Sequence, residues 1–368
     1  MFHRACAAFG AVTALLAVTL VPVAAQTKTI TDIVGRTVTI PDNPQRVLLG
    51  FYFEDFYAIV GENAYDRVVA ISKDAWAGWR NLQWKAYTKT TPKLLKLTDV
   101  GEVDSGSFSV EAAVAARPDI AIIAEWQFTG MGEAVAKLEA AGIPVVVVDY
   151  NAQTVENHVA STLLIGKIMG AEERARKLAD EYAAAVKDII YRVAKISGPK
   201  KRVYIELGNK GPSEYGNTYT DYMWGGVITM AGGENIALGQ VGKWAPLNPE
   251  FVLTTNPEFI FIAGSGWANR DKAVLMGPGI PAEKTYERLR PYMQRAGWAD
   301  MAAINAKQVH ALYHGGARTL YDYAFLQYIA KTLHPEVFAD IDPQATLKRF
   351  FDTYLPIEAN GTYMTRLP

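Results

Sequence analysis

The chain has 368 residues, of which 50% are hydrophobic and 20% charged, and its formal net charge is -1. This length is sufficient for two hydrophobic cores of about 100–200 residues each. A charge so close to zero argues against nucleic acid or an anionic membrane surface as the main partner, because both attract basic proteins.

Residues 1–25 have the features of a secretory signal peptide. His3 and Arg4 give a short positive start, an apolar run follows, and small residues at 23–25 suit cleavage before the next residue. The alternative is an uncleaved anchor, although the run is short for a membrane span. Because the single cysteine, Cys6, lies inside this segment, the mature chain is expected to form no disulfide and no thiolate metal site. We therefore expect export to the periplasm and no membrane insertion after cleavage.

The next part of the chain, 29–153, predicts an α/β lobe. Alternating β-branched residues at 29–40 predict an N-terminal hairpin or a pair of edge strands. Further strands are predicted at 46–50, 67–72, 119–124 and 144–150, with helices at 54–60 and 131–141. Strands that alternate with helices are typical of a mostly parallel sheet with helices on its faces.

The region 154–196 is predicted to be helical, since it contains no proline. From 171 to 195, apolar residues recur every three or four positions, and oppositely charged side chains are spaced four apart on the other face. Such a helix would be about 37 Å long at 1.5 Å per residue. We expect it to bridge two lobes as a stiff connector, so that the lobes move little relative to each other.

The remaining chain, 200–368, predicts a second α/β lobe. Strands are predicted at 202–207, 258–263 and 308–313, and helices at 222–231, 249–255, 320–333 and 343–354, followed by an irregular tail. The two lobes share a repeated passage, because 109–124 and 248–263 align without a gap: a helix N-cap residue, an acid two places on, a short amphipathic run, a proline, an acid and an apolar strand. Two copies of one unit predict two similar lobes with a ligand cleft between them.

No catalytic motif accompanies this pattern. The sequence has no G-x-S-x-G, no Walker A loop and no H-E-x-x-H, and it has five histidines. A secreted metal-dependent enzyme remains an alternative, but it would need a cluster of acids and histidines that the sequence does not show. We expect a binding protein and no enzyme.

The order of these features resembles the secreted substrate-binding proteins of ABC importers, of the type with a helical backbone. The resemblance covers nearly all of 29–355. The segments that carry it are T-D-I-V-G-R-T-V-T-I-P-D-N-P-Q-R-V (31–47), V-G-E-V (100–103), A-A-R-P-D-I-A-I-I (115–123), the long helix, R-V-Y-I-E (202–206) and A-G-G-E-N-I-A (231–237). Such proteins serve ferric siderophores, haem, cobalamin and some metal ions. The resemblance implies two Rossmann-like lobes bridged by one long rigid helix, a ligand in a shallow cleft, a monomer, and an ABC permease as partner.

Ligands of open α/β sheets bind outside the carboxyl ends of the strands, so the loops there supply the candidate ligand residues. We select aromatic and basic residues: Tyr52, Trp76, Trp79, Arg80, Trp126, Tyr215, Tyr219, Trp244, Trp267, Tyr313, His314 and Arg318. Flat aromatic faces suit a planar chelate, and arginine suits carboxylate or catecholate oxygens. The alternative for most of the aromatic residues, and for Phe51 and Phe53 beside them, is core packing, whereas Tyr215 and Tyr219 could be ordinary exposed tyrosines of a loop.

Tyr313 and His314 are also the candidate metal ligands. They open the passage Y-H-G-G-A-R, which follows a predicted strand and precedes a helix. Imidazole can bind iron, cobalt or nickel or donate a hydrogen bond to a chelate. The resemblance implies that a tyrosine or histidine at the cleft completes iron coordination in the ferric-siderophore members. The alternative is a turn with a capping histidine.

The resemblance further implies docking to the permease through one acidic residue at the tip of each lobe. Glu133 begins the helix after the first repeated strand, and the repeat places Asp271 at the corresponding position, where the family normally has glutamate. The alternative is a pair of ordinary acids that complement helix dipoles. Our expectation is thus a periplasmic protein with no intrinsic cofactor that captures an Fe(III) chelate, most simply a siderophore, for an ABC permease. Haem, cobalamin or a nickel complex are the alternatives within the family.

Overall fold

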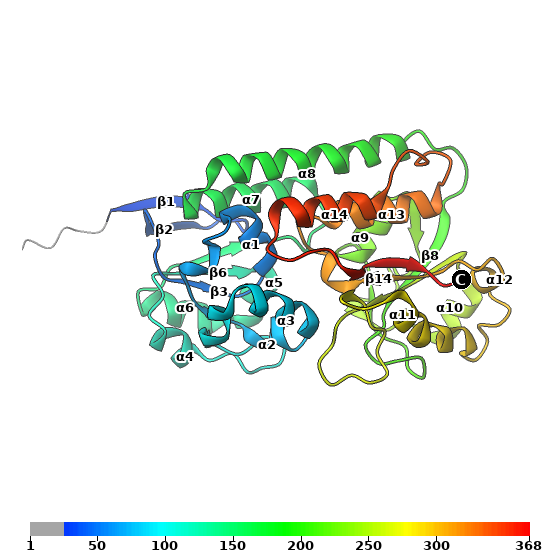
Figure 1. The fold of residues 1–368 in the computed structure, drawn as a ribbon, viewed down its shortest axis with the longest axis horizontal. Helices are drawn as coiled ribbons and strands as arrows, with labels where there is room; N and C mark the ends of the chain where they lie inside the picture. Colours follow the sequence, from blue (N-terminus) through cyan, green and yellow to red (C-terminus); the bar gives the residue numbers. More distant parts are fainter. Residues whose placement is uncertain (1–25) are drawn as a thin grey trace, which may run out of the picture.

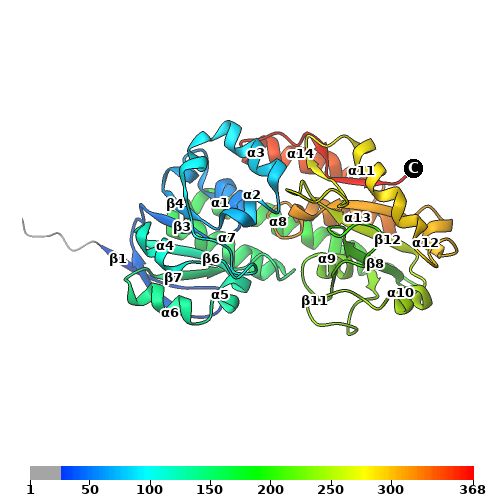
Figure 2. The ribbon, with the colours of Figure 1, turned by 90° about the horizontal axis from the view of Figure 1, so that it is seen from below.

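The computed structural model describes residues 26–368, and the predicted signal peptide with Cys6 lies outside the described residues. Within 26–368, no helix combines the length and the apolar character that crossing a membrane requires. The chain forms two α/β lobes that lie side by side (Figures 1 and 2).

The first lobe contains a five-stranded parallel sheet. Its strands, in spatial order, are β5 (Thr98–Asp99), β4 (Val68–Ile71), β3 (Val47–Leu49), β6 (Ile120–Ala124) and β7 (Val145–Val148). Its helices are α1 (Phe53–Val60), α2 (Lys73–Ala77), α3 (Asn81–Thr90), α4 (Val110–Ala115), α5 (Glu125–Met131) and α6 (Glu133–Ala140), with 3₁₀ turns at Ala64–Asp66 and Pro92–Lys96. The sequences of β3, β6 and β7 are apolar and buried throughout, as expected for a parallel sheet covered on both faces. The predicted hairpin is confirmed by β1 (Thr27–Thr31) and β2 (Thr37–Pro41), which pair antiparallel.

The second lobe contains a five-stranded sheet with one antiparallel edge. Its strands, in spatial order, are β10 (Gly233–Asn235), β8 (Lys201–Leu207), β12 (Phe259–Gly264), β14 (Val309–Tyr313) and β16 (Met364–Arg366). Its helices are α9 (Trp224–Met230), α10 (Pro249–Thr255), α11 (Ala282–Leu289), α12 (Ala302–Asn305), α13 (Asp322–Leu333) and α14 (Pro343–Tyr354), with 3₁₀ turns at Arg290–Gln294 and His314–Gly316. Two short strand pairs lie outside the sheet: β9 (Thr218–Tyr219) with β11 (Trp244–Ala245), and β13 (Gly277–Pro278) with β15 (Gly361–Thr362).

The repeated passage folds the same way in both lobes. Ser109 Oγ accepts a hydrogen bond from Ala112 N at 3.1 Å, and Asn248 Oδ1 accepts one from Glu250 N at 2.8 Å, so each residue caps its helix as predicted. The strands that follow, β6 and β12, each lie between two parallel neighbours. The repeat therefore gives each lobe an interior strand whose carboxyl end faces the region between the lobes.

The predicted irregular tail is wrong. Residues 361–366 contain β15 and β16, and β16 pairs antiparallel with β14. Tyr363 O accepts a hydrogen bond from Tyr313 N at 2.7 Å, which ties the tail to the end of β14. Strands this short leave almost no periodic signal in the sequence, and their partners, β13 and β14, lie far away in the chain.

The helical region is divided into α7 (Val155–Met169) and α8 (Glu172–Val193), which pack against each other. Gly170 adopts a φ of 72° and ends α7, a conformation that glycine adopts without strain. Helix α8 contacts α1 in the first lobe and α9 and α13 in the second, and Figure 1 shows it running past both lobes. The prediction of one long bridging helix at 171–195 is therefore confirmed to within two residues at its C-terminal end.

A second connection joins the lobes in the interior. The two carboxylates of α1 both bind the segment that opens α13: Tyr321 OH donates to Glu54 Oε2 at 2.6 Å, and Leu320 N donates to Asp55 Oδ1 at 2.6 Å. Both carboxylates are buried. Burial raises the pKa of both groups, and a carboxyl group that is buried needs such hydrogen-bond partners to offset its loss of water. The lobes are thus held by the α8 bridge and by this buried contact.

Candidate functional site

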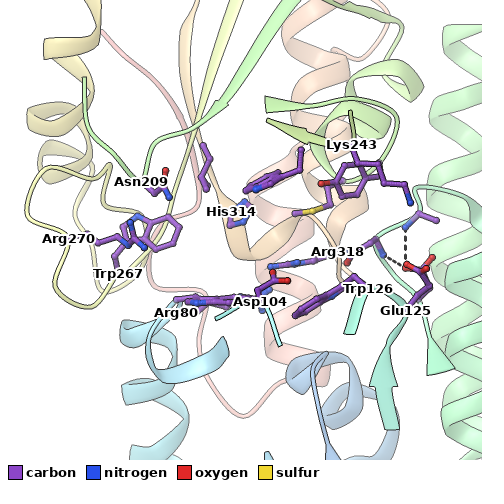
Figure 3. A pocket seen from close by; sticks show the side chains of 18 residues that line it. Arg80, Asp104, Glu125, Trp126, Asn209, Lys243, Trp267, Arg270, His314 and Arg318 are labelled. Carbon is purple, nitrogen blue, oxygen red and sulfur yellow. Dashed lines mark hydrogen bonds between the residues drawn. The ribbon is translucent and has the colours of Figure 1, made fainter. Parts of the chain in front are cut away.

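A pocket of about 420 Å³ lies between the two lobes. In Figure 3, Arg80 and Trp126 rise from the first lobe, while Asn209, Trp267 and His314 come from the second. Seven of the residues that we selected from the sequence line it: Trp79, Arg80, Trp126, Trp244, Trp267, His314 and Arg318. Most of them follow the carboxyl ends of β4, β6, β12 and β14, which agrees with the general position of ligand sites in such sheets.

Aromatic side chains form the two walls of the pocket. In the first lobe, the rings of Trp79 and Trp126 lie 6.2 Å apart between centroids. In the second lobe, Trp267 and His314 stack with centroids 6.2 Å apart and planes at 25°, and Trp244 lies 6.5 Å from His314. The pocket therefore presents flat apolar faces from both lobes to a bound molecule.

Hydrogen bonds between the lobes fix the spacing of these walls on one side. Leu82 N donates to Gly266 O at 3.2 Å, and Ser265 Oγ donates to Trp79 O at 2.9 Å. The segment that carries Trp79 is thus attached directly to the segment that carries Trp267. This attachment adds to the bridge of α8 and makes the pocket a preformed site.

Two buried arginines lie at the pocket without a carboxylate at ion-pair distance. Arg80 and Arg318 are 4% and 8% exposed, and neither takes part in any ion pair within residues 26–368. Arg80 Nη2 and Arg318 Nε are buried and make no hydrogen bond. Burial, and the nearby charge of Arg80, lower the pKa of Arg318 to about 10, so that its guanidinium remains cationic at neutral pH.

Glu54 is not an ion-pair partner of the pocket arginines. Burial raises the pKa of Glu54 and the positive charge of Arg80 partly opposes this rise, but the two side chains form no ion pair. Both Glu54 oxygens instead accept hydrogen bonds from Tyr87 and Tyr321. The Arg80 guanidinium therefore keeps donor capacity for a ligand.

A third buried arginine in the described part of the chain is paired with a carboxylate, as buried charges usually are. Arg295 forms a bidentate ion pair with Glu206, at 2.6 Å and 2.8 Å. Tyr215, which we selected as a ligand residue, belongs to this cluster: its ring lies 4.4 Å from the Arg295 guanidinium, and its hydroxyl accepts a hydrogen bond from Trp298 Nε1 at 2.7 Å. Tyr215 therefore lies outside the pocket, and its role is structural.

His314 is held neutral beside the pocket. Burial, followed by the charges of Arg318 and Arg80, lowers its pKa well below the usual value. The Tyr219 hydroxyl lies 3.1 Å from His314 Nδ1, and the two groups share one hydrogen bond. The other ring nitrogen, Nε2, can then donate a hydrogen bond or offer its lone pair, depending on the tautomer. Tyr219 itself is fully buried behind the histidine, so its place is behind the pocket wall and not in it.

Three further selected residues lie in the core. Trp76 stacks on Phe53 at 4.5 Å, because the turn of α2 directs it inward while Trp79, three residues later, reaches the pocket. Tyr52 donates a hydrogen bond to Asn151 Oδ1 at 3.0 Å. Tyr313 packs edge-on against a tail tyrosine at 5.3 Å, and burial raises its pKa, which disfavours the phenolate form. We therefore remove these three residues from the set that contacts a ligand.

Sequence reasoning missed several residues that line the pocket: Asp104, Glu125, Asp149, Asn151, Ala152, Leu207, Asn209, Tyr222, Met223, Lys243 and Arg270. Asp149 and Asn151 directly follow β7, so the rule of strand ends would have found them had acidic and amide side chains been included. Lys243 and Arg270 lie close in sequence to selected tryptophans and are exposed at the pocket. Together with Arg80 and Arg318 they give the pocket four cationic side chains.

The two predicted docking residues are accessible. Glu133 is the first residue of α6, and Asp271 lies between β12 and β13; both are exposed. Docking to a permease requires exposed side chains, and both residues meet this requirement.

The neutral state of His314 predicts a pH dependence of stability. In the unfolded chain a histidine has a pKa of about 6.5, whereas the folded-state pKa of His314 is well below this value. Below pH 6.5 the unfolded state therefore binds more protons, and the free energy of unfolding falls as the pH falls, by up to about 1.4 kcal/mol per pH unit. His314→Gln should flatten this dependence between pH 7 and pH 5, measured by urea unfolding at each pH. His310, whose pKa burial lowers to about 3, contributes with the same sign and leaves a residual slope. An unchanged slope in His314→Gln would show that His314 is not held neutral.

Comparison with known proteins agrees with the fold. A family model described as a periplasmic binding protein matches residues 47–313. The structure of a TroA-like periplasmic binding protein, FepB from Veillonella parvula, is 36% identical, with a TM-score of 0.85, and the match covers 92% of this chain and 99% of that protein. An uncharacterized ABC transporter substrate-binding lipoprotein, YvrC of Bacillus subtilis, is 25% identical over 323 residues, 85% of this chain and 87% of the relative. A vitamin B12-binding protein of Salmonella paratyphi A is 27% identical over 221 residues, 56% of this chain and 76% of the relative.

These relatives are substrate-binding proteins of transport systems and not enzymes, and they act outside the cytoplasm. The family match covers more than half of the chain, and the fold and the pocket between the lobes agree with it. The chain therefore belongs to the periplasmic binding protein family, as an extracytoplasmic substrate-binding protein of an ABC importer.

Proposed function

We propose that this protein captures an anionic ferric chelate, a siderophore, in the pocket between its lobes. It works in the periplasm as a monomer and delivers the chelate to the permease of its importer. The observation that carries the proposal is the pair of buried arginines, Arg80 and Arg318, which face the pocket and form no ion pair among the described residues.

The chemistry of these arginines favours an anionic ligand. A buried charge without a partner is costly in free energy, and a bound anion removes that cost by pairing with it. Guanidinium groups bind carboxylate and catecholate oxygens through charge-assisted hydrogen bonds, often two at a time. A ligand with several anionic oxygens would satisfy both Arg80 Nη2 and Arg318 Nε.

The shape of the pocket supports a flat, compact ligand. Its volume of about 420 Å³ lies within the usual range for small-molecule sites. The paired rings on the two walls, Trp79 with Trp126 and Trp267 with His314, offer flat faces that suit the aromatic groups of a chelator. We propose that the ligand lies between Trp126 and Trp267, with its anionic oxygens at the arginines.

The iron would arrive with its own oxygen ligands. Residues 26–368 contain no group of three or more histidine, cysteine, aspartate or glutamate side chains that could hold a metal ion. The chelator therefore supplies most of the coordination, and His314 can add one nitrogen or donate a hydrogen bond to the chelate. Cobalamin is the second candidate, because a vitamin B12-binding protein is among the relatives; haem and a nickel complex complete the set of alternatives.

Ligand binding tests this proposal directly. Tryptophan fluorescence is titrated with ferric triscatecholate, ferric citrate, a ferric hydroxamate, haem, cobalamin and nickel-histidine. We expect the tightest binding to an anionic ferric chelate. Arg80→Gln and Arg318→Gln should each weaken it by about tenfold or more, since removing a central buried contact typically costs about 1–3 kcal/mol. Arg349→Gln, an exposed arginine on α14, is the matched control and should bind like the wild type. Tight binding to cobalamin alone, or full affinity in both pocket variants, would contradict the proposal.

Docking is tested separately from capture. We propose that Glu133 and Asp271 pair with arginines of the permease. Glu133→Arg and Asp271→Arg should each abolish uptake in cells while leaving ligand affinity unchanged, because both side chains are exposed and neither lines the pocket. Glu358→Arg, an exposed acid near the C-terminus, is the control and should leave uptake unchanged. Normal uptake in both variants would place the docking surface elsewhere.

A further inference from the structure

Phe51 touches four residues of the pocket without lining the pocket itself. It lies just after β3 and is 1% exposed. The guanidinium carbons of Arg80 and Arg318 lie 5.1 Å and 4.5 Å from the centre of its ring. Trp126 packs edge-on at 5.4 Å, and Trp79 lies at 6.4 Å. One buried ring therefore contacts both uncompensated arginines and both aromatic residues of the first wall.

The ring connects the two lobes as well. Arg80 comes from the first lobe, and Arg318 precedes α13 in the second. Both guanidinium groups approach the same ring, so contact with this ring limits how far apart they can lie. Figure 3 shows Arg80, Trp126 and Arg318 gathered at one end of the pocket.

An aromatic ring stabilises a guanidinium in a way that a carboxylate does not. The face of the ring carries a negative electrostatic potential, which attracts the cation, but the ring has no net charge. A carboxylate at this place would neutralise the arginines and occupy their N–H groups, as Glu206 does for Arg295. Arg295 also contacts three aromatic rings. Its surroundings therefore differ from those of Arg80 and Arg318 in the ion pair with a carboxylate and not in the contact with aromatic rings.

We propose that Phe51 is a positioning residue, which holds Arg80 and Arg318 in place without neutralising them and thereby sets the preference of the pocket for anionic ligands. The inference rests on the proposed function, in that the pocket binds an anion. The lowered pKa of Arg318 agrees with it, since burial and the neighbouring charge of Arg80 produce this shift.

The test compares two phenylalanines of the same loop. Phe51→Leu removes the ring but keeps an apolar side chain, and Phe51→Met repeats the test with a side chain that fills the space differently. Phe53→Leu is the matched control, because Phe53 stacks on Trp76 and makes no cation–π contact with either arginine, while its ring packs against Phe51 at 5.7 Å. Phe51→Tyr keeps the ring and serves as the rescue variant. Binding of ferric triscatecholate, haem, ferrioxamine B and cobalamin is measured for each protein, together with the thermal midpoint.

The expected result is a selective loss of affinity for anions. For the anionic probe that the wild type binds most tightly, Phe51→Leu and Phe51→Met should bind about tenfold more weakly, since two cation–π contacts are removed. Phe51→Tyr and Phe53→Leu should stay within about threefold of the wild type, because the contacts of the arginines with a ring remain. The preference for anionic over cationic or uncharged probes should shrink only in the Leu and Met variants at position 51.

Other results overturn the inference. Equal affinities of Phe51→Leu and Phe53→Leu would show that the ring of Phe51 acts through packing alone. The same conclusion would follow if the affinity for all probes fell equally and in proportion to the drop in thermal midpoint. A wild type that binds haem and not ferric triscatecholate would refute the siderophore proposal, while the position-51 variants would still test the inference on haem. A wild type that binds no anionic probe, or prefers cobalamin or ferrioxamine B, would refute both.

Discussion

The structure depends on two positive charges that are buried side by side and left unpaired. Removing a guanidinium from water is costly unless an opposite charge replaces the water, and Arg80 and Arg318 form no ion pair within residues 26–368. The contrast with Arg295, which binds Glu206 through two hydrogen bonds, shows that this fold can pair a buried arginine fully. The unpaired state at the pocket therefore represents stabilisation that only a bound anion completes.

The rest of the architecture keeps this site in place. Helix α8 spans the lobes, the carboxylates of Glu54 and Asp55 hold the start of α13, and Ser265 joins the two tryptophan walls. Each connection is made between residues of the chain itself, and together they hold the arginines and aromatic faces in one arrangement. A preformed site loses little conformational entropy when the ligand arrives, and more of the interaction energy appears as affinity. In our proposal, the Phe51 ring holds the two arginine side chains in position in the same way.

Periodic and repeated features could be predicted from the sequence, whereas features that depend on distant partners could not. The apolar stripe of α8 and the repeated passage predicted the bridge and the interior strands, because their signals are local. Trp76 and Trp79 carry the same local signal, but the direction of α2 turns one into the core and the other into the pocket. Tyr215 was misplaced because Arg295, eighty residues away in the chain, determines its surroundings. The strand β16 escaped prediction for the same reason, since β14 defines it.

The most direct test of the account is a crystal structure of the protein with its bound ferric chelate. The account predicts that anionic oxygens of the chelate lie within hydrogen-bond distance of both Arg80 and Arg318, with the lobes in the arrangement of the free protein. A chelate whose anionic oxygens contact neither arginine, or a complex in which a protein carboxylate pairs with them, would contradict it.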